Sequence, residues 1–195
     1  MKTTRLTAFL SLFFLLQGNL FAVTKTAAVT GLWGTAATWS PSGVPAAGDD
    51  AVIPNGITVT MNNTYTINSV TVNVGGTYTF QAGKKINIGA GGLTCNGTVN
   101  MNTGDITLSV AAPFVLGSGS TFTWNPSTNT VAGATLFTLG VESFATTSTL
   151  IIKKWYNFAV PLGSLVTGDF GNLTLNSVNG ASLYEWNQNN MLNRI

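Results

Sequence analysis

Apolar and polar residues alternate along most of the chain after position 50. Residues 57–61 read Ile-Thr-Val-Thr-Met, and residues 70–74 read Val-Thr-Val-Asn-Val. A period of two places the apolar side chains on one face of a β-strand, and β-branched residues such as Val, Ile and Thr favour that conformation. Each run is short and is followed by glycine or asparagine, which are typical of turns. The pattern therefore predicts a succession of short β-strands, each with one apolar face.

Many of these runs begin at a glycine, and together they form a weak internal repeat. The runs start at Gly56, Gly76, Gly92, Gly97, Gly104, Gly119 and Gly171. Successive full cycles take about 15 to 20 residues, near the short end of the repeat lengths of solenoid proteins. One cycle is long enough for two or three short strands joined by glycine corners, which is one turn of a parallel β-helix. We expect the glycines to supply positive φ angles at the corners, and threonine and asparagine to stack in ladders inside or outside the turns.

The second half of the chain is less regular but has the same character. Strands are predicted at residues 113–117, 136–140 and 149–155, with a polar loop at 125–130. No amphipathic helical pattern is found after the first 22 residues, so the expected class is all-β. A β-sandwich is the main alternative to the β-helix, because strands spaced about 8–12 residues apart also fit that fold. The near absence of charge from the alternating runs favours stacked turns.

Residues 1–22 have the build of a secretory signal peptide. Two basic residues precede an apolar core at residues 6–16, and the segment ends at Ala22. This core is too short to span a bilayer, and the alternative is an anchor that stays uncleaved. We expect cleavage after Ala22, with a site near Ala27 or Ala28 as the alternative. The expected localisation is secreted or cell surface, with no membrane span after cleavage.

Two further regions follow this leader. Residues 23–50 are expected to form an N-terminal segment and cap, and residues 51–195 the β-helical domain. Residues 176–190 are rich in asparagine and glycine, and the sequence stops soon afterwards. A solenoid that stopped there would expose a strand edge, a hazard that proteins normally cover. We therefore expect either a pairing partner or a C-terminally truncated reading frame.

Charge and cysteine content narrow the class of protein. The chain has 8 Lys and Arg residues and 6 Asp and Glu residues, and removal of the two basic residues of the leader leaves 6 of each. A near-neutral chain without a basic stripe is a poor candidate for binding nucleic acid. Cys95 is the single cysteine, which excludes a disulfide framework. The alternation turns Cys95 inward as a small buried hydrophobe, with a reactive thiol as the alternative.

Groups for catalysis are few. The chain has no histidine, which excludes Ser-His-Asp and Cys-His catalysis and histidine-ligated zinc. Acid–base chemistry is left to Asp49, Asp50, Asp105, Glu142, Asp169 and Glu185, whose spacing selects no glycosidase-like pair. Asp49-Asp50 is interpreted as a turn leading into the first strand rather than as a calcium site. Glycine-rich residues 89–92 lack the lysine and the helix of a phosphate-binding loop. We predict no catalytic residue, no metal ligand and no cofactor, hence a protein that is not an enzyme.

Aromatic side chains are the feature that a ligand would use. A sugar ring stacks well on the face of an indole or a phenol. The candidates for such carbohydrate stacking are Trp33, Trp39, Trp155, Tyr156 and Trp186. For Trp33 and Trp39 the alternative is a structural role, in which both indoles fold over the open end of the first β-layer as a cap.

Residues 33–59 carry a resemblance to known proteins. They combine two tryptophans with Gly43-Val44-Pro45, Gly48-Asp49-Asp50-Ala51-Val52-Ile53-Pro54 and Gly56-Ile57-Thr58-Val59. This run resembles the opening motif of large secreted β-helical surface proteins of Bacteroidetes-type bacteria, and it is similar to the start of G8 domains. Residues 170–175, Phe-Gly-Asn-Leu-Thr-Leu, resemble a motif that recurs in the same bacterial proteins. The resemblance implies a right-handed parallel β-helix and export, often with a C-terminal sorting domain. No such domain is recognised in this sequence, which agrees with a truncated reading frame.

Two functional hypotheses follow from these observations. The first is a non-catalytic structural or adhesin-like module of an exported surface protein, with a glycan or another surface protein as its partner. The alternative is the N-terminal part of a β-helical polysaccharide-active enzyme, such as a lyase, or a carbohydrate-binding module. Lyases of this architecture cluster basic and acidic groups on one face, so the scattered charges of this chain favour the first hypothesis.

Overall fold

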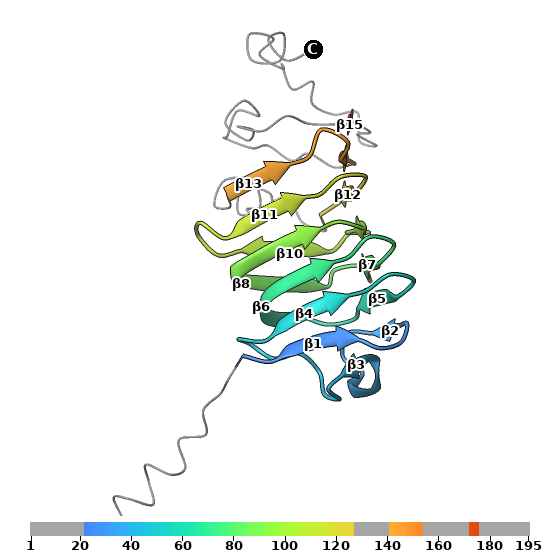
Figure 1. The fold of residues 1–195 in the computed structure, drawn as a ribbon, viewed down its shortest axis with the longest axis vertical. Helices are drawn as coiled ribbons and strands as arrows, with labels where there is room; N and C mark the ends of the chain where they lie inside the picture. Colours follow the sequence, from blue (N-terminus) through green and yellow to red (C-terminus); the bar gives the residue numbers. More distant parts are fainter. Residues whose placement is uncertain (1–21, 127–140, 154–171, 176–195) are drawn as a thin grey trace, which may run out of the picture.

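The computed structural model describes residues 22–126, 141–153 and 172–175 of the chain. These residues form an elongated stack of short strands that run across its long axis (Figure 1). The helical structure in this part of the chain is a short 3-10 turn, η1 (Ala36–Thr38). The predicted all-β class is therefore confirmed.

Two sheets make up most of the stack. Sheet A contains, in spatial order, β13 (Val141–Phe144), β11 (Pro113–Leu116), β8 (Lys85–Cys95), β6 (Tyr65–Val72), β4 (Asp50–Ile53), β1 (Thr24–Ala27) and β3 (Trp39–Ser40). Sheet B contains β15 (Asn172–Leu175), β14 (Thr149–Ile152), β12 (Thr121–Trp124), β9 (Thr98–Asn100), β7 (Thr77–Phe80), β5 (Thr58–Met61) and β2 (Gly31–Leu32). Apart from β3, which folds back onto β1, strands next to each other in space come from successive coils of the chain, so each coil contributes one strand to each sheet.

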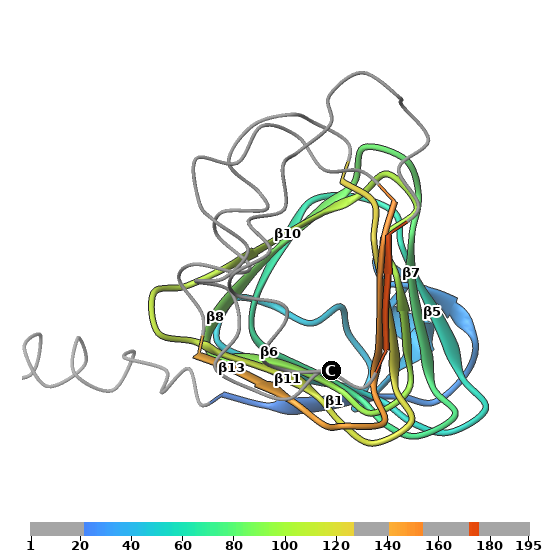
Figure 2. The same cartoon turned by 90° about the horizontal axis from the view of Figure 1, so that it is seen from above.

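A third wall closes the cross-section. It is formed by the first halves of β6 and β8 and by β10 (Asp105–Leu108), which pairs with β8. Figure 2 shows the three walls end-on as the sides of a triangle, and together with Figure 1 it shows that the chain climbs as a right-handed coil. Right-handed connections are the rule for parallel strands. The predicted right-handed parallel β-helix is confirmed, and the β-sandwich alternative is wrong because its strands would pair antiparallel.

The register gives the length of each coil. Thr58 pairs with Thr77 and Thr77 with Thr98, so these coils advance by 19 and 21 residues. The coil from Thr121 to Thr149 advances by 28 residues. The coil of 19 residues agrees with the predicted cycle of about 15 to 20 residues, whereas the coils of 21 and 28 residues are longer. The sequence pattern underestimates them because a coil of three strands contains more than one glycine-headed run.

Stacked side chains of the inward faces fill the interior. One column of buried residues runs through sheet A as Ile53, Val72, Cys95, Leu116 and Phe144. A second column runs through sheet B as Val59, Tyr78, Val99, Phe122 and Leu150. Burying a side chain of this size stabilises the fold by about 1.5–3 kcal/mol. Each coil thus covers the apolar face of the next.

Glycine serves two purposes at the corners. Gly56 has a φ of 74° between β4 and β5, a conformation that costs other residues about 1–2 kcal/mol. Gly97 has no positive φ, but a Cβ atom there would collide with the carbonyl oxygens of Asn73 and Gly76 in the preceding coil. The predicted positive φ is therefore confirmed at Gly56 and wrong at Gly97, where the close approach of two coils requires glycine.

The first coil begins earlier than the sequence pattern indicates. β1 (Thr24–Ala27) pairs in parallel with β4, and β2 pairs in parallel with β5, so residues 24–32 already belong to the solenoid. The predicted boundary at residue 51 is therefore too late. The alternation in β1 and β2 is too short to be recognised, because these strands span four and two residues.

We expect Tyr78→Phe to leave the free energy of unfolding unchanged or to raise it by up to about 1 kcal/mol. The Tyr78 side chain is fully buried, and its hydroxyl has no hydrogen-bond partner among the described residues. Phenylalanine lacks this unpaired buried polar group, and its ring keeps the packing of the tyrosine ring. Tyr78→Ala, which removes the ring, is expected to lose about 3–5 kcal/mol. Urea unfolding measures both, and a loss above about 1 kcal/mol in Tyr78→Phe would contradict the unpaired hydroxyl.

Candidate binding face

The two tryptophans predicted to stack on sugar are buried. Trp33 is 0% exposed and Trp39 is 2% exposed. Their ring centroids lie 4.9 Å apart in an edge-to-face arrangement, and the Trp39 Nε1–H donates to the Trp33 carbonyl oxygen at 2.8 Å. Trp33 also lies 5.6 Å from Tyr78, measured between ring centroids. The sugar-stacking prediction is therefore wrong for Trp33 and Trp39, because neither indole face is open to a ligand.

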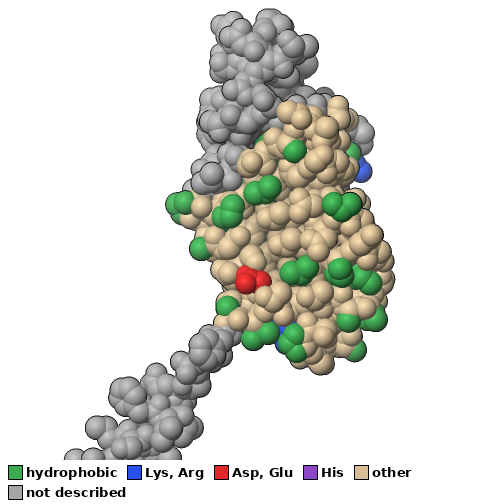
Figure 3. All heavy atoms as spheres, viewed as in Figure 1, with side chains coloured by type: hydrophobic (Ala, Val, Ile, Leu, Met, Phe, Trp, Pro, Cys, Tyr) green, Lys and Arg blue, Asp and Glu red, His purple; other side chains and the backbone are tan. Residues whose placement is uncertain are grey.

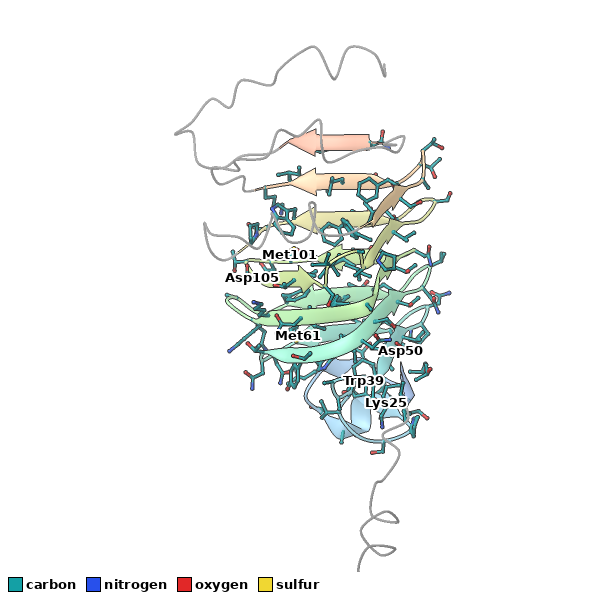
Figure 4. The ribbon with its side chains drawn as sticks, turned by 90° about the vertical axis from the view of Figure 1, so that its left-hand side faces the viewer. Lys25, Trp39, Asp50, Met61, Met101 and Asp105 are labelled. Atoms are coloured by element: carbon teal, nitrogen blue, oxygen red, sulfur yellow. The ribbon has the colours of Figure 1, made fainter. Side chains whose placement is uncertain are left out.

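These indoles instead close the N-terminal end of the stack. β3, which contains Trp39, pairs antiparallel with β1 and ends sheet A on that side. The Lys25 ammonium group donates to the carbonyl oxygens of Pro41 and Ser42 at 3.1 and 3.2 Å, which holds the following turn against β1. Figure 4 shows Lys25 and Trp39 at this end of the molecule. The geometry agrees with the alternative interpretation, a cap made by the two tryptophans.

The other three aromatic candidates, Trp155, Tyr156 and Trp186, lie outside the described residues. Of the predicted carbohydrate-stacking residues that the structure describes, Trp33 and Trp39, neither contributes to an open platform.

The carboxylates of the first coils make structural hydrogen bonds. Asp49 accepts from the backbone N–H groups of Val23 and Ala46 at 3.1 and 2.9 Å, as expected for a turn residue. Asp50 accepts from Asn68 Nδ2 and Ser69 Oγ at 2.8 and 2.5 Å, in the next coil. The interpretation of this pair as a turn that leads into a strand is confirmed.

Asp105, the other acidic side chain that the structure describes, does not lie near this pair. Asp105 begins β10 in the third wall and is almost fully buried, opposite Lys85 in the register. Asp50 and Asp105 lie apart, at different levels of the stack (Figure 4). Among residues 22–126, 141–153 and 172–175, no three His, Cys, Asp or Glu side chains come together as a metal site. Glycine-rich residues 89–92 lie inside β8, where the register with β6 shifts.

The outward face of sheet B carries a regular array of hydroxyl groups. In β5, β7 and β9 the buried residues alternate with outward ones, and the pairing aligns the corresponding residues of successive coils. In β12 the corresponding residue Thr123 is itself buried. The first outward column is Thr58, Thr77, Thr98, Thr121, Thr149 and Asn172. The second is Thr60, Thr79, Asn100, Thr123, Ile151 and Thr174. We call these two columns the threonine face.

The threonine face is uncharged. None of the strands β5, β7, β9, β12, β14 and β15 contains Asp, Glu, Lys or Arg. None places an aromatic side chain on this face, because Tyr78, Phe80, Phe122 and Trp124 all point inward and are buried. Thr98, Asn100 and Thr174 are exposed to solvent. The face therefore offers mainly hydroxyl and methyl groups in two columns, together with the amides of Asn100 and Asn172 and the aliphatic side chain of Ile151.

Sheet A presents a different outer surface. Its outward residues include Asp50, Asn68 and Val52 as well as threonines such as the paired Thr71 and Thr94, so no single residue type continues through the whole sheet. Figure 3 shows this side of the molecule, where hydrophobic side chains are scattered among uncharged polar groups and backbone. Of the two sheets, sheet B has the more regular outer face.

Comparison with protein families identifies the family of this chain. Residues 38–154 match the G8 domain, and this match covers more than half of the 195 residues. The chain belongs to the G8 domain family. The resemblance that the opening motif indicates is thereby confirmed for the family. Comparisons with curated proteins and with solved structures find no match.

The G8 match begins at the last residue of η1 and ends two residues after β14. It therefore contains all of β3–β14, including five of the six strands that build the threonine face. Within the described residues no helix has the length and apolar character needed to cross a membrane.

Cys95, which lies within the matched G8 region, is buried as the sequence predicts. It is 0% exposed and occupies the inward column of sheet A, between Val72 and Leu116. Burial raises the pKa of the Cys95 thiol from 9.0 to about 12, and the hydrogen bond to the Gly97 carbonyl at 3.4 Å offsets only part of this effect. A group in this position is protonated at neutral pH, so the alternative of a reactive thiol is not supported.

We expect native Cys95 to resist iodoacetamide at pH 8 and to react at once when the protein is unfolded in urea. Because its pKa is raised on folding, the thiol stabilises the fold below pH 9 and this contribution is lost as pH rises from 9 toward 12. Wild type should therefore lose stability relative to Cys95→Val between pH 8 and 11, measured by urea unfolding. Valine is a suitable control because Val72 occupies the same column one coil earlier. Rapid labelling of the native protein at pH 8 would contradict the buried thiol.

Proposed function

We propose that this G8 domain is a non-catalytic, adhesin-like structural module of an exported protein, and that it makes contact through the threonine face. The observation that carries the proposal is the register of sheet B, which places outward threonines of consecutive coils in straight columns. A face of this kind is rigid, since its backbone is held by parallel strand pairing on both sides and threonine has restricted χ1 freedom. Rigid groups lose little entropy on binding, which favours contact over a broad flat area.

The hydrogen bonding of Asp49 and Asp50 supports the proposal that this module is not an enzyme. A glycosidase needs two carboxyl groups about 5–9.5 Å apart with a sugar between them. Asp49 and Asp50 are instead engaged with backbone and side-chain donors of the first coils. The alternative, an N-terminal part of a lyase-like enzyme or a carbohydrate-binding module, would have to use residues beyond these.

Export is supported by the position of Val23. The backbone nitrogen of Val23 lies 3.1 Å from Asp49 Oδ1, so cleavage after Ala22 would convert this hydrogen bond into a charge-assisted one. Cleavage near Ala27 or Ala28 would remove β1, which links β3 to β4 in sheet A. We therefore infer that the protein is secreted or displayed at the cell surface with Val23 as its first residue.

Intact-mass measurement of the protein from culture medium and cell envelope tests this cleavage site. We expect an N-terminus at Val23, because that product keeps β1 and places its new α-amino group beside Asp49. A product starting at Ala28 or Val29 would contradict the inference. Retention of residues 1–22 in the envelope fraction would favour an uncleaved anchor instead.

The proposed function is tested by incubating the purified protein with pectin and hyaluronan and measuring viscosity and chain length. We expect no depolymerisation, because Asp49 and Asp50 are engaged in structural hydrogen bonds. In parallel, attachment of the labelled protein to cell envelopes and to particles of insoluble neutral polysaccharide should fall in Thr79→Lys. Thr71→Lys is the matched control, since Thr71 is an equally half-buried outward threonine in β6 of sheet A.

Depolymerisation that is lost in Asp50→Asn or Asp105→Asn would overturn the proposal in favour of the enzyme. Equal loss of attachment in Thr79→Lys and Thr71→Lys would show that contact does not depend on the threonine face. Both results are decisive only for folded variants, so thermal unfolding is measured alongside.

A further inference from the structure

We infer that the ligand of the threonine face is the ordered water lattice of ice. This inference rests on the proposed function in one respect: it takes the threonine face as the contact surface. It adds the chemistry of the surface that is bound. Three properties of the face carry it: the repeat of its hydroxyl groups, its lack of charge and aromatic rings, and its length.

The repeat along the solenoid axis matches that of ice. Thr58, Thr77, Thr98, Thr121 and Thr149 are direct neighbours in the parallel ladder, one per coil. Paired strands lie about 4.7–4.9 Å apart, so equivalent hydroxyl groups repeat at this distance. Water molecules joined tetrahedrally by O–H···O bonds of about 2.75 Å place second-neighbour oxygens about 4.5 Å apart. The two repeats agree to within about 0.3 Å.

The repeat across the sheet is also close to a lattice spacing. Thr77 and Thr79 are two residues apart on the same face of β7, as are Thr58 and Thr60 on β5. Residues i and i+2 of a parallel strand are about 6.6 Å apart. The same tetrahedral geometry repeats along the hexagonal axis of ice about every 7.3 Å. A difference of about 0.7 Å lies within the reach of hydroxyl groups on two adjacent columns.

The chemistry of the face favours water over the other candidate surfaces. A polysaccharide is commonly held by stacking on aromatic rings, and an acidic one by basic groups. The outward positions of β5, β7, β9, β12, β14 and β15 provide neither. They provide hydroxyl groups, each both donor and acceptor, beside methyl groups. A neutral lattice of water molecules complements a neutral array of such groups.

The number of groups compensates for the weakness of each contact. A single hydrogen bond exchanged with water contributes little net free energy. An array fixed by one backbone ladder presents all its hydroxyl groups together, so the entropy of arranging them is already lost in folding. Asn100 and Ile151 interrupt the second column and its Thr123 is buried, whereas the first keeps threonine from Thr58 to Thr149. We therefore assign the first column the larger share of the contact.

Ice-affinity partitioning of the purified full chain tests the inference. A labelled sample is cooled slowly around a growing ice crystal, and the protein in the ice is compared with that in the liquid. We expect the wild type to be enriched in the ice, and Thr79→Lys and Thr98→Lys each to lower that enrichment about tenfold or more, since a lysine holds the face away from the lattice. Thr71→Lys, on sheet A, should partition like wild type. Thr98 is exposed, so its variant is expected to fold even if Thr79→Lys does not.

Three results would overturn the inference. The first is exclusion of wild type from the ice to the extent of a soluble control protein of the same size. The second is equal loss in Thr71→Lys and the threonine-face variants. The third is self-association through this face, seen by sedimentation as a dimer that Thr79→Lys abolishes. If ice partitioning fails while Thr79→Lys still lowers attachment to envelopes or polysaccharide particles, the proposed function stands without ice as its ligand.

Discussion

The structure depends on the register of its parallel strand pairs. Every coil must return the chain to a position where its residues face the equivalent residues of the coil before, because a shift by one residue would turn each apolar side chain outward. The pairings Thr58–Thr77 and Ala51–Val70 hold this register in two sheets at once. The interior columns, the outer threonine columns and the close approach at Gly97 all follow from it. A coil therefore accommodates extra residues only at corners, as it does within residues 89–92 of β8.

The same register has opposite effects on the two sides of sheet B. Inward, it stacks unlike residues such as Val59, Tyr78 and Val99, whose sizes only need to fill the space between the walls. Outward, it stacks like residues, because threonine fits a pleated surface and hydrogen-bonds to water. The interior thus tolerates variety, while the exterior is nearly uniform. A uniform exterior is not required for folding, as sheet A shows with its mixed outer face.

Local patterns allow the strands and the fold class to be predicted, but not the residues that meet across coils. The alternation at residues 57–61 and 70–74 has a period of two in any β-fold, and the glycines indicate corners. The threonines of the threonine face are visible in the sequence, yet the coils of 19, 21 and 28 residues hide their alignment. Trp33 and Trp39 were ambiguous because an indole serves equally well in a cap and on a sugar-binding surface. Burial decides between these roles, and burial depends on β3 folding back onto β1.

The antiparallel strand β3 gives the stack a direction of growth. Thr26 and Ala27 pair with Ser40 and Trp39 in the reversed sense, so the N-terminal edge of sheet A no longer presents a template for a parallel coil. Duplication of a coil can therefore lengthen this domain only behind the cap, where each copy adds about 4.7–4.9 Å and one more row to every column. A gene that gains or loses one coil changes the reach and the number of surface contacts of the protein in equal steps. The cap stays the same while the number of coils varies, so the length of the domain can change without a change in its N-terminal end.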